Sequence, residues 1–300
     1  MSSATLQQRL FLVTGANKGI GFELVKKLAQ ESSSNVVLLG SRNLKRGQDA
    51  LQQLGSPCNV HVLQLDTSSK ESIARATEEI RQTYGGQLDV IVNNAGIALP
   101  TETVEAAREI FATNYYGVKI LNEHLFPLLQ DNARVVNVAS GVGPIGLSTA
   151  SRELQDKYAS QTLTATELDQ LVVDFLSAHE SGTLNEVGYS SELPYMLYSI
   201  SKAALIALTH VEARQSFGDR RVFVYSVCPG FCATDLNNNA PGARSAALGA
   251  DSILYVINTP TAELENGAFY QDAEKLPQIC EDPAKVQSFI DAAKKITPAK

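Results

Sequence analysis

The sequence predicts a doubly wound α/β fold, in which a parallel sheet of about seven strands carries helices on both faces. Short apolar, β-branched runs alternate with helix-forming segments along the chain, and a glycine-rich turn joins the first run to the first helix. Repeated β-α units of this kind require parallel strands joined by right-handed crossovers. Together, the alternation and the glycine turn indicate a Rossmann-type architecture.

Seven short runs rich in Val, Ile and Leu are typical of strands that are covered on both faces. They are Arg9–Val13, Asn35–Leu39, Val60–Leu65, Leu88–Val92, Ala133–Val138, Arg221–Val227 and Ala268–Tyr270. Apolar spacing predicts helices between and after them, at Gly19–Gln30, Asn43–Leu54, Lys70–Tyr84, Val104–Leu129, Tyr198–Phe217 and Ala243–Val256. Pro283, after the possible cap Asp282, predicts the start of a terminal helix.

One long connection interrupts this alternation. Between Gly141 and Pro194 no strand is expected, and the stretch is long for a loop in a compact domain. It contains the pattern of a helix capping box, Thr164–Glu167, before an apolar helical stripe. We interpret residues 145–192, approximately, as a helical insertion over the carboxyl edge or side of the sheet. We expect residues 1–300 to form a single domain.

Composition narrows the class of protein. With 300 residues, 44% hydrophobic and 19% charged, the chain can bury a core without metals or disulfides. A net charge of -7 disfavours nucleic acid and anionic membranes as partners. The four cysteines are too scattered for a disulfide framework, and neither a signal peptide in Met1–Leu10 nor a membrane-spanning run is recognisable. We therefore expect a cytoplasmic protein with no nucleic-acid or membrane partner.

The first turn has the features of a dinucleotide-binding loop. Its glycines are spaced G-x-x-x-G-x-G, a variant of the common pattern, directly after a strand and before a helix. Glycines at these points allow a tight turn and a close approach of backbone to a pyrophosphate. The predicted cofactor contacts are Gly15, Asn17, Lys18, Gly19, Ile20 and Gly21. The alternative is a glycine-rich turn that only connects strand to helix.

The end of the second strand indicates which cofactor is bound. NAD-specific sites place an acidic residue there to hold the ribose 2′-hydroxyl, but here no carboxylate occurs before Asp49. Arg42, with Lys18 across the loop, can instead bind a 2′-phosphate through charge-assisted hydrogen bonds. The alternative is that both are ordinary solvated cations. The sequence favours NADP(H) over NAD.

Tyr198 and Lys202 form a candidate proton-transfer pair. Four residues apart on a predicted helix, they share one face. A phenol has a pKa of about 10, and a nearby ammonium is expected to lower it. The spacing alone is weak, because Tyr115 and Lys119 repeat it. Small neighbours around Tyr198, which would let a cofactor approach, favour the Tyr198 pair.

The ordered set of motifs resembles the short-chain dehydrogenase/reductase family. The matching positions run through nearly the whole chain: Thr14–Gly21, Asp66, Asn93–Gly96, Asn114, Ser140, Tyr198–Lys202, Pro229–Gly230 and Thr234. Each is weak alone, but their order is specific.

The resemblance implies a role for each matching residue. Tyr198 would donate the proton, Ser140 would hydrogen-bond the substrate oxygen, and Lys202 would hold the nicotinamide ribose. Asn114 would support a water relay to the lysine. For the cofactor, Asp66 would contact adenine, Thr234 the nicotinamide end, and further contacts would come from Asn94, Pro229 and Gly230.

For several of these residues a purely structural role is the alternative. Ser140 could be a simple strand-end hydroxyl, Asn114 a mid-helix polar residue, and Asp66 a helix cap or turn residue. The Pro229–Gly230 pair would end a strand in many folds.

The long insertion, with Asn17–Lys18 and Cys228–Phe231, resembles the monomeric carbonyl reductase branch of this family. The resemblance implies NADPH-dependent reduction of a small carbonyl compound, an aldehyde, ketone or quinone. Gly141–Ile145 and the insertion would line the pocket for this substrate. It also implies a monomer, because the insertion would cover helix faces that pair in oligomeric relatives. Two other functions remain possible: an NADP-binding sensor without turnover, and an alcohol dehydrogenase that works mainly in the oxidative direction. No metal site is expected, since the histidines and cysteines lack ligand spacing.

Overall fold

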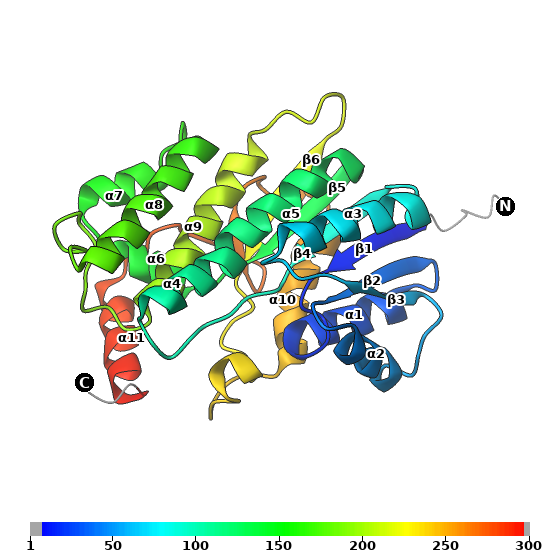
Figure 1. Ribbon diagram of the computed structural model, residues 1–300, viewed down its shortest axis with the longest axis horizontal. Helices are drawn as coiled ribbons and strands as arrows, with labels where there is room; N and C mark the ends of the chain where they lie inside the picture. The colour runs from blue at the N-terminus through cyan, green and yellow to red at the C-terminus, as the bar shows by residue number, and fades with distance from the viewer. Residues whose placement is uncertain (1–7, 297–300) are drawn as a thin grey trace.

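The computed structural model describes residues 8–296, in which an eight-stranded sheet lies between two layers of helices (Figure 1). The strands are β1 (Arg9–Val13), β2 (Asn35–Ser41), β3 (Val60–Gln64), β4 (Leu88–Asn93), β5 (Leu129–Val138), β6 (Val222–Val227), β7 (Phe269–Gln271) and β8 (Glu274–Leu276). Most of the amino-terminal segment that was tested for a signal peptide lies outside the described residues.

The helices follow the expected alternation with the strands. They are α1 (Gly19–Glu31), α2 (Leu44–Gln53), α3 (Lys70–Tyr84), α4 (Val104–Phe111), α5 (Gly117–Leu125), α6 (Val142–Ser148), α7 (Arg152–Tyr158), α8 (Ala165–Ser181), α9 (Met196–Ala213), α10 (Ala246–Asn258) and α11 (Pro283–Ile296). Short 3₁₀ turns occupy Phe126–Leu128, Asp235–Asn237 and Thr261–Glu263. Among the described residues, no helix combines the length and apolar character needed to cross a membrane.

The order of the strands, β3-β2-β1-β4-β5-β6-β7-β8, places the start of the chain in the middle of the sheet. Strands β1 to β7 pair in parallel, and the order reverses between β1 and β4. In open parallel sheets of this kind, ligands bind outside the carboxyl ends of the strands at such a reversal. The predicted Rossmann-type fold is confirmed, and the sheet directs attention to the loops after β1 and β4.

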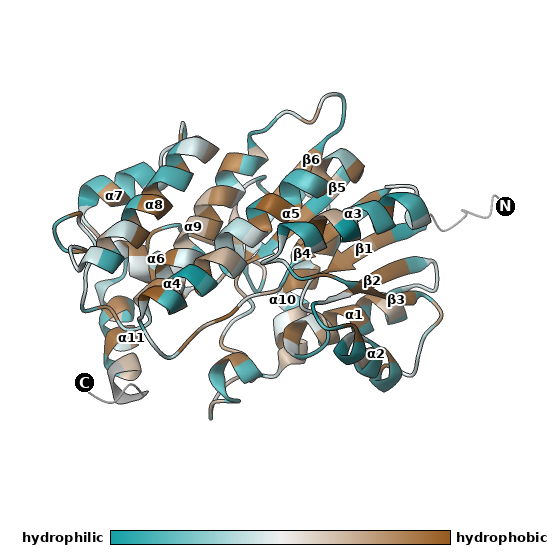
Figure 2. Cartoon of the chain, viewed as in Figure 1, coloured by the Kyte–Doolittle hydropathy of each residue, from teal (hydrophilic) through white to brown (hydrophobic). Residues whose placement is uncertain are grey.

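Alternate residues of each strand face opposite helix layers, as the period of a strand requires. In β1, Phe11 and Val13 pack with α1 and α10, whereas Leu10 and Leu12 pack with α3 and α5. The strands are therefore apolar on both faces, while the outward faces of α2 and α3 are hydrophilic (Figure 2). This pattern explains why the strands could be recognised as continuous apolar runs.

The structure differs from the expectation in the number of strands. Eight are present rather than about seven, because the antiparallel β8 follows β7 after a two-residue turn, Asp272–Ala273. Three residues, Glu-Lys-Leu, give too short and too polar a signal for a strand.

The expected helix Val104–Leu129 is also interrupted. A π-helical turn, Ala112–Tyr116, separates α4 from α5, and Pro127 lies in the 3₁₀ turn that precedes β5. Inside the π turn, Asn114 bonds both backbone polar groups of Ile97, so a tertiary contact accompanies the irregularity.

The insertion between β5 and α9 contains α6, α7 and α8 and no strand. Its longest helix, α8, begins with the expected capping box of Thr164 and Glu167. The insertion packs on helices: α6 lies against α9, and α8 lies against α4 and α9 (Figure 1). Its apolar stripe joins one core with α4 and α9, in which Phe175 stacks on Phe111 at 5.4 Å between ring centroids.

Candidate active site

The loops after β1 and β4 are bonded to each other at the reversal of strand order. The Ala95 N–H donates to Thr14 Oγ1 at 2.9 Å, and Asn94 Nδ2 donates to the carbonyls of Thr14 and Gly15. Asn94, predicted as a cofactor contact, thus holds the glycine loop in place through these two hydrogen bonds. The contact is tight, because a Cβ on Gly21 would lie 2.5 Å from Asn94 Nδ2.

Glycine is required in this loop for two separate reasons. Gly15 has a φ of +62°, and a Cβ there would lie 2.9 Å from the Cα of Ala95. At Gly19, with a φ of +61°, the nearest side chain is Thr234, at 3.3 Å from an ideal Cβ. Both positions combine left-handed backbone with close neighbours. Gly19 thereby brings the loop next to Thr234, so two of the predicted cofactor residues, far apart in the chain, lie side by side.

The amino end of α1 is free to receive an anion. Its first residue follows Lys18, whose side chain forms no cap, and the first turn contains no acidic residue. By contrast, α2, α3, α4, α7, α8 and α10 are capped by the side chains of Asn43, Ser69, Thr103, Ser151, Thr164 and Ser245. Uncapped N–H groups and the helix dipole together attract a phosphate. The loop and helix therefore fit a dinucleotide pyrophosphate.

The remaining predicted cofactor residues lie around this loop. Asn17 is partly exposed, and Ile20 packs against the apolar core beside α10. Lys18 is paired with Asp235 at 2.6 Å, and both side chains are more than half exposed. Such an exposed pair contributes little stability, so the ammonium remains available to a phosphate.

Arg42 and Asp66 follow the neighbouring strands β2 and β3. Arg42 is exposed and forms no ion pair within residues 8–296. Asp66 is partly buried, and its carboxylate accepts hydrogen bonds from the Ser68 N–H and hydroxyl. The alternative interpretation of Asp66 as a turn residue therefore applies in this structure, alongside any contact to a cofactor.

Ser140, Tyr198 and Lys202 come together although the insertion separates Ser140 from the other two in sequence. Ser140 follows β5, and its hydroxyl lies close enough to Tyr198 on α9 to lower the pKa of that phenol. The Lys202 ammonium lies 5.7 Å from the centre of the Tyr198 ring and donates to the carbonyl of Val138 at 2.8 Å. The hydroxyl of Ser140, the phenol of Tyr198 and the amine of Lys202 thus lie together at the carboxyl edge of the sheet.

The electrostatics of this cluster differ from the expectation. Burial raises the pKa of Tyr198 well above its ordinary value, more than the hydrogen bond from Ser140 lowers it. Burial also lowers the pKa of Lys202 to about 8. The lower pKa expected for Tyr198 beside Lys202 is not reached in this arrangement, because the ammonium is directed at Val138 and desolvation of the phenol outweighs the favourable charge. Tyr198 holds its proton at neutral pH, which is the form needed to donate it.

Asn114 lies beside Lys202 and is fully buried. Its side-chain oxygen accepts from the Ile97 N–H at 2.9 Å, and its nitrogen donates to the Ile97 carbonyl and to Ser201. A Cβ on Gly96 would lie 3.3 Å from both Asn114 Oδ1 and Lys202 Nζ. The small residue after β4 therefore leaves both polar groups open toward the same space.

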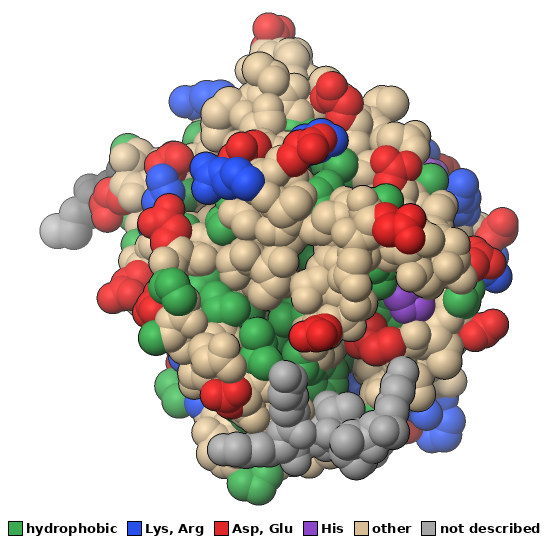
Figure 3. Space-filling view, turned by 90° about the vertical axis from the view of Figure 1, so that its left-hand side faces the viewer, with side chains coloured by type: hydrophobic (Ala, Val, Ile, Leu, Met, Phe, Trp, Pro, Cys, Tyr) green, Lys and Arg blue, Asp and Glu red, His purple; other side chains and the backbone are tan. Residues whose placement is uncertain are grey.

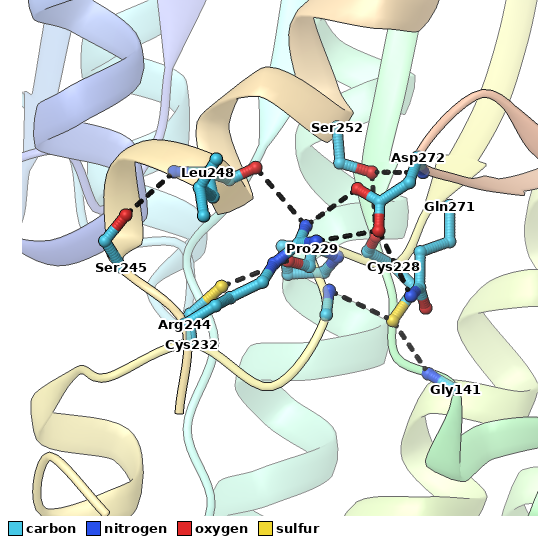
Figure 4. Close-up of polar contacts among 11 residues, drawn as sticks. Gly141, Cys228, Pro229, Cys232, Arg244, Ser245, Leu248, Ser252, Gln271 and Asp272 are labelled. Atoms are coloured by element: carbon cyan, nitrogen blue, oxygen red, sulfur yellow. Dashed lines mark hydrogen bonds and ion pairs between the residues drawn. The ribbon is translucent and has the colours of Figure 1, made fainter. Parts of the chain in front are cut away.

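Cys228 is a residue of the site that sequence reasoning missed. Its sulfur accepts the N–H groups of Gly141 and Gly230, at 3.2 and 3.3 Å, and so ties the end of β5 to the end of β6 (Figure 4). Pro229 is buried, and Gly230 has a φ of +76°. The sequence marked Cys228 only as part of the motif Cys228–Phe231, and its contacts could not be predicted because one of the two backbone donors, Gly141, is far away in sequence.

The second Tyr-x-x-x-Lys pair lies away from this cluster. The Tyr115 hydroxyl donates to Asp169 of α8 at 2.8 Å, and Lys119 pairs with the same carboxylate at 3.2 Å. Tyr115 and Lys119 therefore hold the insertion against α5, which is a structural role.

Apolar surface surrounds the candidate site. Ile97 and Leu99 from the loop after β4, and Ile279 before α11, pack on the core formed by α4, α6, α8 and α9. On the face with the insertion and α11, apolar side chains gather in a hollow with acidic side chains nearby (Figure 3). A cavity of about 260 Å³ between α3 and α5 contains none of the predicted site residues in its lining. The described residues contain no cluster of metal-ligating side chains.

Comparisons with known proteins agree with this geometry. A family model described as short chain dehydrogenase matches residues 9–166. Carbonyl reductase [NADPH] 1 of Sus scrofa is 37% identical over 285 residues, which cover 91% of this chain and 94% of the relative. The structure of salutaridine reductase from Papaver somniferum superimposes with a TM-score of 0.78 and 29% identity, over 88% of this chain and all of that one. Menthone neomenthol reductase from Mentha piperita gives a TM-score of 0.74 and 28% identity, over 88% and 98%.

Proposed function

Since the chain belongs to the short-chain dehydrogenase/reductase family, as an NADPH-dependent enzyme of its carbonyl reductase branch, we propose that Tyr198 donates the proton in carbonyl reduction. The observation that carries this proposal is the meeting of Ser140, Tyr198 and Lys202 at the carboxyl edge of the sheet. NADPH, when bound, supplies the hydride that reduces the carbonyl carbon. The Tyr198 hydroxyl gives its proton to the carbonyl oxygen, and the product is the alcohol.

Ser140 and Lys202 support that transfer. The Ser140 hydroxyl, which lies beside Tyr198, turns its single proton to the substrate oxygen as negative charge develops there. As Tyr198 loses its proton, the nearby ammonium of Lys202 stabilises the phenolate. Asn114 keeps the loop after β4 in place beside Lys202 and supports a water relay that returns a proton to this pair.

The cofactor is held along the edge from β3 to β6. Gly15, Gly19 and Gly21, with Asn17, Ile20 and Asn94, form the cradle for the pyrophosphate at the amino end of α1. Lys18 and Arg42 bind the 2′-phosphate, and Asp66 contacts the adenine. Pro229, Gly230 and Thr234 hold the nicotinamide end. Cys228 joins the turn before Gly230 to Gly141, which follows Ser140, and Thr234 lies beside Gly19 of the phosphate cradle.

The substrate is a small carbonyl compound of moderate polarity, an aldehyde, ketone or quinone. The apolar residues near the site, Ile97, Leu99 and Ile279, support this class. We also propose that the protein is a cytoplasmic monomer that needs no nucleic-acid or membrane partner. Its free cysteines at 58, 228, 232 and 280 suit a reducing compartment.

Absorbance of NADPH with a panel of aldehydes, diketones and quinones tests the proton donor. We expect Tyr198→Phe to lower kcat by roughly 100- to 10,000-fold, because general acid catalysis is lost while the ring remains. Tyr115→Phe is the matched control: it removes the other hydroxyl, which contacts Asp169, and should keep turnover. Wild-type turnover that survives in Tyr198→Phe would contradict the assignment.

A further inference from the structure

Arg244 closes a loop that reaches from the catalytic edge to the phosphate cradle. The segment Phe231–Arg244 begins after Gly230 and carries Thr234 beside Gly19. Its two ends are joined by backbone hydrogen bonds, from the Arg244 N–H to Phe231 and from the Ala233 N–H to Arg244. Segments with closed ends of this kind form compact Ω-loops that are frequently functional.

The Arg244 side chain connects this loop to the sheet. Its Nε donates to the Pro229 carbonyl at 2.8 Å, and its two terminal nitrogens bind the two carboxylate oxygens of Asp272 at 2.7 and 2.9 Å (Figure 4). The fork of a guanidinium matches a carboxylate in this bidentate way, and a lysine does not. One side chain thus holds the turn after β6 and the hairpin β7–β8 together.

Asp272 is itself held in a strained position. Asp272 and Ala273 are the central residues of the β7–β8 turn, with φ values of +50° and +71°. Such turns favour glycine, and left-handed backbone at Ala273 costs free energy. The Asp272 N–H donates to Ser252, whose hydroxyl donates to the Cys228 carbonyl. Strain that persists within such a network is typical of functional sites.

We propose that Arg244 is a positioning residue for the nicotinamide end of the cofactor site. Bound to Asp272, it fixes the turn Cys228–Gly230 and the loop that carries Thr234 in the geometry that NADPH requires. This inference rests on the proposed function, in which Pro229, Gly230 and Thr234 hold that end of NADPH. Arg244 packs directly against this turn: a Cβ on Gly230 would lie only 2.6 Å from Arg244 Nε.

Two ligands separate this role from a general structural one. NADPH spans the whole site, whereas adenosine 2′,5′-bisphosphate contains only the adenine end and its phosphates. In Arg244→Gln and in Asp272→Asn, we expect the Kd of NADPH to rise roughly ten-fold, the loss of one such interaction. The Kd of adenosine 2′,5′-bisphosphate should stay within two-fold, an order-of-magnitude bound for an undisturbed site. The KM for NADPH should rise with its Kd.

The double variant and two further variants sharpen the test. Because the only contact of Asp272 in question is the one to Arg244, the double variant should lose no more affinity than Arg244→Gln alone. Arg244→Lys should be intermediate, because a lysine can pair with Asp272 but cannot also donate to Pro229. Arg221→Gln removes a comparable pair with Asp131 at the opposite end of β5 and β6 and should leave both affinities unchanged.

Either of two results would overturn the proposal. One is a wild-type Kd for NADPH in Arg244→Gln and Asp272→Asn. The other is an equal loss of both ligands, which indicates a fault in the whole fold; thermal unfolding of each variant detects this directly. A failure of the proton-donor assignment would appear elsewhere, as retained turnover in Tyr198→Phe.

Discussion

At the scale of single residues, we propose that the position after β2 selects the cofactor. Arg42 is exposed at the carboxyl end of β2, next to Ser41, whose carbonyl accepts the Leu65 N–H of the neighbouring chain segment. A cation there attracts the 2′-phosphate of NADPH, whereas a carboxylate would accept a hydrogen bond from the 2′-hydroxyl of NADH.

Arg42→Asp should therefore reverse the preference. We expect the Kd of NADPH to rise by roughly 10- to 100-fold, as a charge-assisted contact is replaced by repulsion, and NADH to bind better than in the wild type. Fluorescence titration with each cofactor measures both effects. Arg75→Asp, the same change of charge on the exposed face of α3, controls for net charge. An unchanged ratio of the two affinities would remove Arg42 from the site.

The resemblance predicted which residues come together, whereas residue spacing alone could not, and neither predicted the electrostatics of the cluster. Tyr198 and Tyr115 each precede a lysine by four residues, and only the surroundings distinguish them: Ser140 lies at one and Asp169 at the other. The raised pKa of Tyr198 follows from burial, which no local pattern encodes. Asp235, the partner of Lys18, lies more than two hundred residues away, so its contact could not be predicted.

At the scale of elements, local signals located almost every strand and helix of the described chain. The predicted β1 and α3 match the structure at both ends, because apolar pattern and caps coincide there. The misses have tertiary causes: the π turn forms where Asn114 bonds Ile97, and β8 exists through its pairing with β7. The insertion was expected over the edge or side of the sheet and against helix faces, and its helices pack on α4 and α9.

The position of the insertion predicts the oligomeric state. Leu168, Val172 and Phe175 of α8 are fully buried against the core that includes α4 and α9. Asp169 adds bonds to Tyr115 and Lys119 on the same side. Apolar helix surface that could pair two copies is thereby buried within one chain.

Light scattering of the purified chain should accordingly give the mass of a monomer, close to 32.3 kDa, across a wide range of concentration. A mass that doubles as concentration rises would show that another surface pairs the chains, and would contradict this use of the insertion.

At the scale of the whole molecule, a buried polar network joins the sheet to both helices on one face. Glu212 of α9 is 2% exposed and accepts two hydrogen bonds from Asn122 of α5. Asn93 of β4 bonds Asn122 and Asn137, and Asn137 bonds Thr209. Burial raises the pKa of Glu212 to about 8, more than the bonds from Asn122 and Asn137 lower it. Two charged side chains affect its pKa less strongly: Glu123 raises it and Lys119 lowers it.

This network makes the stability of the fold depend on pH. The folded state holds the Glu212 proton up to about pH 8, whereas a glutamate in the unfolded chain releases it near 4.5. Rising pH therefore favours unfolding across that interval, by up to about 1.4 kcal/mol per pH unit from this one group.

Glu212→Gln mimics the protonated acid and removes this dependence. Urea unfolding should find the variant close to the wild type at pH 5 and more stable than it at pH 7.5, while the exposed control Glu186→Gln follows the wild type throughout. Parallel stability curves for Glu212→Gln and the wild type would mean that Glu212 is ionised in the folded protein, and that the asparagine donors outweigh its burial.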